Sequence, residues 1–143
     1  MNALTTDDIL APDGRIAQRL EHYEHRPQQQ AMAQAVQRAL AQEQHLIVEA
    51  GTGVGKSFGY LVPAILWATE NEEHQRDDDD DDSDRRRVII STHTISLQEQ
   101  LLTKDLPLLN SVIPREFTSV LVKGRRNYIS LRRLQMAQQR ASQ

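Results

Sequence analysis

Apolar residues in this chain occur in two patterns, short consecutive runs and stripes with helical spacing. Three successive apolar residues stand at the centre or end of each run, and the runs occupy residues 45–49, 87–91 and 118–122. Runs of this length bounded by polar residues are typical of buried β-strands. Apolar residues three and four positions apart predict the main helices, over residues 28–42, 57–69 and 94–103.

Shorter elements complete the expected order. Residues 15–23 predict a short helix, 106–112 a helical piece that ends near Pro114, and 128–139 a basic helix. Residues 1–14 end in a Pro-Asp-Gly turn and are expected to form a flexible tail. One domain is therefore predicted over residues 15–143.

Helices and strands alternate regularly along this domain. Such alternation predicts an α/β fold, in which helices cover both faces of a parallel sheet. Ligands of such folds bind at the carboxyl ends of the strands. Residues that follow the three predicted strands are therefore the first candidates for chemistry.

The first predicted strand leads directly into Ala50-Gly51-Thr52-Gly53-Val54-Gly55-Lys56-Ser57. Glycines at alternate positions allow a tight turn whose backbone N–H groups surround phosphates. Lys56 is placed to reach the β- and γ-phosphates of a nucleoside triphosphate, and Ser57 to bind Mg²⁺. Ala50 replaces the glycine of the strict pattern, which is a small change. A chance glycine-rich turn is the alternative, and the strand–loop–helix context disfavours it.

Composition excludes several classes of site. The chain of 143 residues has no cysteine, so it offers no disulfide, zinc thiolate or iron–sulfur ligand. Only six aromatic residues are present, which predicts an aliphatic core. No signal peptide and no membrane-spanning run is recognisable, so we expect a cytoplasmic protein without a membrane partner.

The net charge of −3 conceals a strong asymmetry. Seven aspartates lie between residues 77 and 84, and the rest of the chain carries +4 without them. Residues 71–86 contain no apolar side chain and predict a disordered acidic loop. Consecutive carboxylates lack the spacing of a calcium loop, so a metal site there is disfavoured. An acidic decoy for a basic groove is a further alternative.

The C-terminal part of the chain is basic. Residues 104–143 hold eight lysines and arginines against two acids. A basic region beside a phosphate loop indicates a polyanionic partner, and a solvated helical face is the alternative.

Five segments together carry a family resemblance: Arg26–Met32, 49–57, Ser91–Leu101, Lys104-Asp105 and Val122–Tyr128. In this order they resemble the N-terminal part of DinG-type, XPD-like superfamily 2 DNA helicases, over about residues 23–134. The resemblance implies an incomplete P-loop NTPase domain of the RecA-like type. It also implies ATP-driven movement along DNA, with a role in DNA repair.

The resemblance assigns a role to each matching residue of the nucleotide site. Gln29 matches the glutamine that reads adenine, and its amide can both donate and accept hydrogen bonds. The alternative is that residues 28–30 are polar helix surface. Residues Ala50 to Ser57 match the ATP-binding loop, with Lys56 as the catalytic lysine and Ser57 as the Mg²⁺ ligand.

A second set of residues matches the part of these helicases that touches single-stranded DNA. The set comprises Thr92, His93, Thr94, Gln98, Gln100, Lys123, Arg125 and Arg126. Small hydroxyls and a helix N-terminus suit phosphate contacts that do not depend on base identity. Thr94 is also suited to cap the following helix, and the three basic residues could be ordinary solvated surface.

Two departures from the family pattern limit what we expect. Ser130 stands where iron–sulfur members carry their first cluster cysteine, so no iron–sulfur cluster is expected. No strand after the phosphate loop ends in the acidic pair that ATP hydrolysis requires, since residues 118–122 lead into Lys123. A second motor domain with its arginine finger is also missing.

The chain alone is therefore expected to bind ATP without hydrolysing it, as the product of a truncated reading frame or as a fragment. A stand-alone module that binds nucleotide or nucleic acid is the main alternative. A small phosphate-loop kinase is disfavoured because no acceptor site or lid motif is recognisable.

Overall fold

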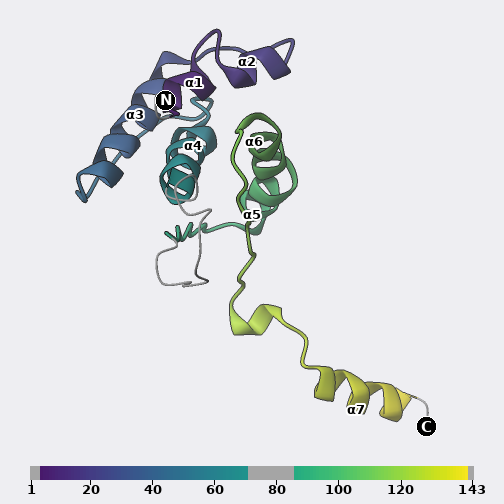
Figure 1. The fold of residues 1–143 in the computed structure, drawn as a ribbon. Helices are drawn as coiled ribbons and strands as arrows, with labels where there is room; N and C mark the ends of the chain where they lie inside the picture. Colours follow the sequence, from purple (N-terminus) through teal and green to yellow (C-terminus); the bar gives the residue numbers. More distant parts are fainter. Residues whose placement is uncertain (1–3, 71–85, 142–143) are drawn as a thin grey trace, which may run out of the picture.

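The structure is a computed structural model that describes residues 4–70 and 86–141. Figure 1 shows its helices, drawn in chain order from purple to yellow. They are α1 (Thr6–Leu10), α2 (Arg15–Arg19), α3 (Pro27–Ala41), α4 (Lys56–Thr69), α5 (Ile95–Gln100), the π-helical turn η3 (Leu101–Asp105), α6 (Leu106–Val112), the 3₁₀ turn η4 (Arg125–Asn127) and α7 (Leu131–Ala141). The predicted helices are thus present, with boundaries that differ by a few residues.

The helices α3 and α4 flank the phosphate loop and pack on each other. Pro27 occupies the first turn of α3, where its missing N–H leaves no hydrogen bond unmade. Gly59 of α4 faces Met32 of α3 so closely that a Cβ would lie 3.0 Å from its sulfur. This close approach holds the start of α4 against α3.

The segment from α5 to α6 packs on the other side of α4 (Figure 1). Leu101, Leu109 and Val112 join Leu61 and Val62 of α4 in one buried cluster. The core is aliphatic, as the composition predicts.

The prediction of a flexible tail over residues 1–14 is wrong for residues 5–10, and residues 1–3 lie outside the described part of the chain. Thr5 and Asp8 form a capping box, in which the Thr5 N–H donates to Asp8 Oδ2 at 2.7 Å and the Asp8 N–H to Thr5 Oγ1 at 3.4 Å. Hydrogen bonds from the Thr5 backbone and side chain lower the pKa of Asp8. Ile9 and Leu10 are buried in the core. Local capping and long-range burial together order this segment.

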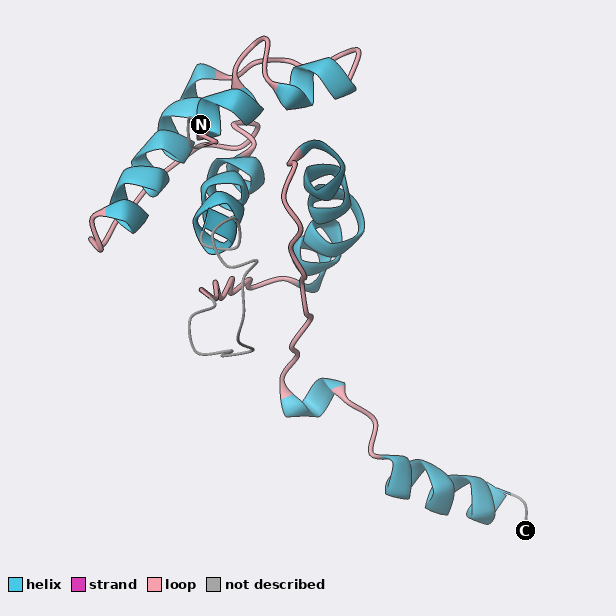
Figure 2. Ribbon diagram, viewed as in Figure 1, coloured by secondary structure: helices cyan, strands magenta, loops and turns pink. Residues whose placement is uncertain are grey.

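The predicted parallel sheet is not confirmed. Figure 2 shows no strand in the described part of the chain, and residues 45–49, 87–91 and 118–122 run as extended loops. Among described residues, no backbone hydrogen bond joins one of these segments to another. The central side chains Ile47, Ile89 and Val120 are 99%, 93% and 83% exposed. An apolar run favours an extended backbone, but a strand also needs a hydrogen-bonded neighbour.

The C-terminal elements extend away from the core. Figure 1 shows η4 and α7 beyond the packed helices, and none of their residues is buried. The leucines Leu131 and Leu134 of α7 are exposed. This region therefore contributes little to the core that positions the phosphate loop.

The predicted acidic loop of residues 71–86 lies outside the described residues, apart from Arg86. Arg86 donates hydrogen bonds to the Trp67 carbonyl at 3.1 Å and to Glu70 Oε2 at 2.8 Å, and its guanidinium lies over the Trp67 ring. These contacts tie the chain after the insertion to the end of α4.

None of the helices described is long and apolar enough to cross a bilayer.

Candidate nucleotide and nucleic-acid sites

The phosphate loop leads directly into α4. Gly53 and Gly55 have positive φ angles of 84° and 78°, which side chains other than glycine rarely adopt. Gly55 is the N-cap of α4, so the loop turns into the helix through a left-handed residue. A Cβ at Gly51 or Gly53 would meet no atom within 4 Å, which leaves open space around the loop. An open loop beside the first turn of a 14-residue helix fits a chain of phosphates.

Lys56 folds back over this loop. Its Nζ donates a hydrogen bond to the Ala50 carbonyl at 2.9 Å, and the side chain is exposed. The ammonium group is therefore held at the start of the loop, at the Ala50 carbonyl. Ser57 follows in the first turn of α4 and is half-buried. Loop, lysine and serine are thus brought together as the sequence predicts.

Gln29 is buried beneath the loop rather than exposed on α3. It is 3% exposed, and its Nε2 donates to the Gly55 carbonyl at 2.9 Å. The alternative of a polar helix surface holds for Gln28, which is exposed, but not for Gln29. The hydrogen bond holds Gly55 in its left-handed conformation. Adenine recognition by Gln29 stays a prediction.

The fit around Gly55 leads to a testable prediction. A Cβ there would lie 2.1 Å from Gln29 Nε2, and the positive φ adds about 1–2 kcal/mol of backbone strain. We expect Gly55→Ala to weaken ATP binding about ten-fold or more in a fluorescent-nucleotide titration, because the loop must move to relieve the overlap.

Gly124→Ala is the matched control, since Gly124 lies outside the phosphate loop, has no positive φ, and its Cβ would meet only Asn127 Nδ2, at an ordinary contact distance of 3.8 Å. Its ATP affinity is expected to stay within about two-fold of the parent chain. Equal affinities of the two variants would show that the contact between Gln29 and Gly55 does not hold the loop.

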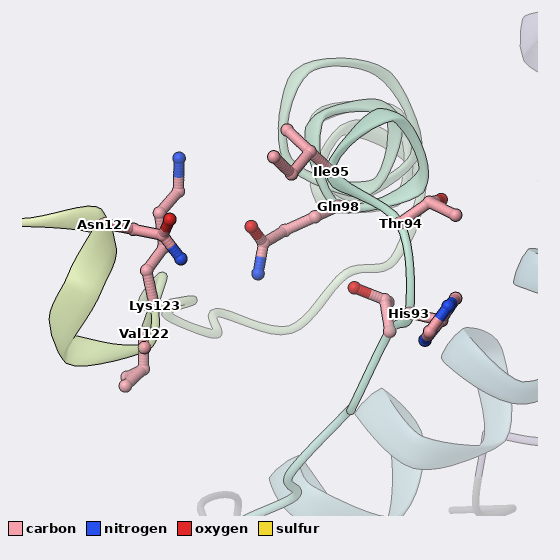
Figure 3. Close-up of a pocket in the computed structure, with 9 residues that line it drawn as sticks. His93, Thr94, Ile95, Gln98, Val122, Lys123 and Asn127 are labelled. Carbon is pink, nitrogen blue, oxygen red and sulfur yellow. The ribbon is translucent and has the colours of Figure 1, made fainter.

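A second site forms where two distant segments meet. Figure 3 shows an open hollow between the start of α5 and the turn before η4. Its lining includes five residues predicted to contact single-stranded DNA: Thr92, His93, Thr94, Gln98 and Lys123. Gln98 extends from α5 toward the side on which Lys123 and Asn127 lie. Tertiary structure thus joins the two predicted segments in one surface.

Local hydrogen bonds hold both walls of this hollow. The Leu97 N–H donates to Thr94 Oγ1 at 3.3 Å, so Thr94 caps α5, as its alternative interpretation predicts. The Lys123 N–H donates to the Tyr128 hydroxyl at 2.8 Å, which closes the turn between them. Capping leaves the other lone pair of Thr94 free to accept, so both roles of Thr94 remain compatible.

Three predicted contact residues lie outside the hollow. Arg125 and Arg126 belong to η4 and are exposed, and Gln100 lies at the end of α5. The Gln100 Nε2 instead donates to Asp105 Oδ2 at 3.3 Å. Asn127, Ile95 and Val122 line the hollow although they were not predicted as site residues. All three fall within the segments Ser91–Leu101 and Val122–Tyr128, whose family resemblance was the signal that could have pointed to them.

Comparison with known proteins identifies the family of the chain. The model of the DEAD/DEAH box helicase family matches residues 26–138, which include both sites. The chain belongs to the DEAD/DEAH box helicase family. This family implies a P-loop NTPase fold of the RecA-like type and the use of ATP, usually with Mg²⁺.

The relatives of this helicase chain carry DinG and YoaA names. It is 38% identical over 130 residues to the ATP-dependent DNA helicase YoaA of Escherichia coli strain K12, which is 91% of this chain. It is 43% identical over 110 residues to the ATP-dependent helicase DinG of Mycobacterium tuberculosis, which is 74% of this chain. A protein of Bacillus subtilis named 3′-5′ exonuclease DinG is 38% identical over 109 residues, which is 76% of this chain.

These matches cover most of this helicase chain but little of each relative. The chain spans 18%, 15% and 10% of the lengths of the three relatives, in the same order. No solved structure matches the chain. The resemblance to DinG-type helicases is thus confirmed at the level of the family.

Proposed function

We propose that this chain is the N-terminal ATP-binding part of a DinG-like ATP-dependent DNA helicase. It binds ATP with Mg²⁺ on residues 50–57 and single-stranded DNA at the hollow beside α5. The observation that carries the proposal is the loop itself, in which Lys56 folds back to the Ala50 carbonyl and open space surrounds Gly51 and Gly53.

In the nucleotide site, different residues bind the phosphates, Mg²⁺ and adenine. The N–H groups of the loop donate to phosphate oxygens, and Lys56 exchanges the Ala50 carbonyl for the β- and γ-phosphates. The Ser57 hydroxyl holds Mg²⁺ at the start of α4. Gln29 supports Gly55 from below, and its side-chain amide is proposed to read the adenine edge.

Hydrolysis needs more than these residues. In P-loop enzymes an acidic residue holds Mg²⁺ and another group orients the attacking water. Neither predicted strand after the loop ends in an acidic pair, because one leads into Thr92 and the other into Lys123. We therefore expect this chain of 143 residues to bind ATP without turning it over.

The nucleic-acid site is expected to read phosphates rather than bases. The polar side chains that line it are two hydroxyls, the His93 imidazole, two amides and the ammonium group of Lys123, which suit a sugar–phosphate backbone. The wall formed by Ile95 and Val122 adds apolar surface for a base or sugar. Binding is therefore expected to be sensitive to salt and tolerant of sequence.

Lys123→Ala tests this site directly. We expect weaker binding of a fluorescent oligothymidylate, with a shallower dependence on salt. The slope of log K against log salt should fall by about 0.7, the value for one phosphate contact on a single strand. Fluorescence anisotropy at several salt concentrations measures both quantities.

Arg140→Ala is the matched control, since Arg140 lies in the last turn of α7, far along the chain from the hollow. It should leave the slope unchanged. Equal slopes for the parent chain and the Lys123 variant would place the DNA elsewhere.

A stand-alone binding module without motor activity remains the alternative function. Both proposals place nucleotide and single-stranded DNA on the same residues. They differ in whether a longer protein that contains this chain hydrolyses ATP in a way that depends on Lys56.

Ser130 is exposed, and the chain contains no cysteine, so these residues supply no thiolate to an iron–sulfur cluster.

A further inference from the structure

The first turn of α3 carries Gln29 but lacks the groups that usually stabilise the start of a helix. The N-cap residue Arg26 makes no side-chain hydrogen bond to the turn, and the turn contains no acidic residue. Helix ends without such caps fray. Fraying would withdraw the Gln29 amide from the Gly55 carbonyl, to which it donates at 2.9 Å. A contact from outside α3 is therefore needed to hold this turn.

Asp7 of α1 supplies such a contact. Its Oδ1 accepts hydrogen bonds from Gln30 Nε2 at 2.6 Å and from Gln34 Nε2 at 2.9 Å, and its Oδ2 lies 3.2 Å from the same Gln34 nitrogen. Gln30 and Gln34 are four residues apart, so they lie on one face of α3. One carboxylate thus spans the first two turns of α3, directly after Gln29.

Gln30 is bound from a second side as well. Its Oε1 accepts a hydrogen bond from His25 Nε2 at 2.7 Å, while its Nε2 donates to Asp7. Both ends of this side-chain amide are therefore engaged. The residue that follows Gln29 in the sequence is held between α1 and the segment before α3.

Helix α1 is itself anchored on the core. Ile9 and Leu10 are completely buried, and Thr6 Oγ1 donates to Gln37 Oε1 at 2.9 Å, further along α3. Figure 1 shows α1 beside α3, on which it packs. The Asp7 side chain is exposed, so water competes for its hydrogen bonds and their loss should have a moderate effect.

We propose that Asp7 is a positioning residue of the nucleotide site and that it acts through Gln30 and Gln29. The inference rests on the proposed function, in which residues 50–57 bind ATP with Mg²⁺. Asp7 itself does not touch the nucleotide. By holding the first turn of α3, it keeps Gln29 beneath Gly55 and so keeps the phosphate loop in the shape that binds phosphates.

Charge and geometry predict opposite effects of removing this carboxylate. A negative charge repels the phosphates of ATP, so loss of the charge alone would tighten binding slightly. Loss of the hydrogen bonds frees the first turn of α3 and weakens binding. We expect Asp7→Ala to weaken ATP binding about five-fold. Titration of the full chain of 143 residues with a fluorescent ATP analogue and Mg²⁺ measures the change.

Asp8→Ala is the matched control. Asp8 is the neighbouring carboxylate of α1, and its Oδ2 accepts hydrogen bonds from Thr5 within the capping box. Its removal takes away the same charge and should leave ATP affinity within about two-fold of the parent chain. Asp7→Asn should do the same, because its Oδ1 can still accept from both glutamines.

A double-mutant cycle tests the route. Gln29→Ala removes the hydrogen bond to Gly55, so adding Asp7→Ala to it should change ATP affinity by less than about two-fold. Gln30→Ala breaks the contact from the α3 side and should weaken ATP binding about as much as Asp7→Ala. Circular dichroism checks the fold, and Gln30→Ala decides the outcome should Asp7→Ala unfold.

Several results would overturn the inference. Unchanged ATP affinity in both Asp7→Ala and Gln30→Ala does so and leaves the proposed function intact, provided that Lys56→Ala still weakens binding. Equal weakening by Asp7→Ala and Asp8→Ala shows a general loosening of α1 instead. An undiminished effect of Asp7→Ala in the Gln29→Ala background excludes the route through Gln29. Failure of the parent chain to bind ATP refutes the proposed function, and the inference with it.

Discussion

Lys56→Ala is expected to weaken the binding of ATP with Mg²⁺ by about 10- to 100-fold. The Nζ group lies over the phosphate loop, and hydrogen bonds to charged groups contribute about 1.5–3 kcal/mol. Each 1.4 kcal/mol corresponds to about a factor of ten in affinity. Titration with a fluorescent ATP analogue measures the change. The side chain is exposed, so stability should change little.

Lys123→Ala provides the reciprocal control for this experiment. It removes the same side chain from the hollow beside α5 and should leave ATP affinity without DNA within about two-fold of the parent chain. Lys56→Ala should in turn leave oligothymidylate binding without ATP unaltered. An ATP affinity of Lys56→Ala equal to that of the parent chain would contradict the assignment of residues 50–57 as the phosphate site.

Ile9→Ala is expected to lower the stability of the chain strongly. Ile9 is completely buried in the core, and truncation of such a side chain costs about 2–5 kcal/mol. That is a large part of the ~5–15 kcal/mol by which domains are stable. Urea denaturation followed by circular dichroism measures the loss as a lower midpoint with an unchanged slope.

Ile95→Ala is the matched control, because it removes the same atoms from a side chain that is 63% exposed. Its free energy of unfolding should stay within about 0.5 kcal/mol of the parent chain. If residues 1–14 formed a flexible tail, Ile9→Ala would change the free energy of unfolding as little as Ile95→Ala does. The comparison therefore decides whether α1 belongs to the core.

The missed helix α1 was recognisable in the sequence. Thr5 with Asp8 three residues later, just before Ile9 and Leu10, is the pattern of a capping box before an apolar pair. The Pro-Asp-Gly turn after it is instead typical of a loop. Burial of Ile9 depends on α3 and α4, and no local pattern reveals such contacts.

Local chemistry allowed the phosphate loop and the helices to be predicted. The glycines of residues 50–57 and the helix that follows them are a local signal of an anion site, and helical spacing places α3 and α4 within a few residues. The family resemblance rests on the same short segments, and the family match confirms it.

Other features depend on contacts between residues far apart in the chain, and only the tertiary structure decided them. Burial of Gln29 depends on Gly55, and the hollow beside α5 depends on the approach of Lys123 to Thr92. The predicted strands show the same dependence, because an apolar run becomes a strand only when another segment completes its hydrogen bonds. The sequence by itself therefore determined the loop and its helices, whereas the fold determined what lies against them.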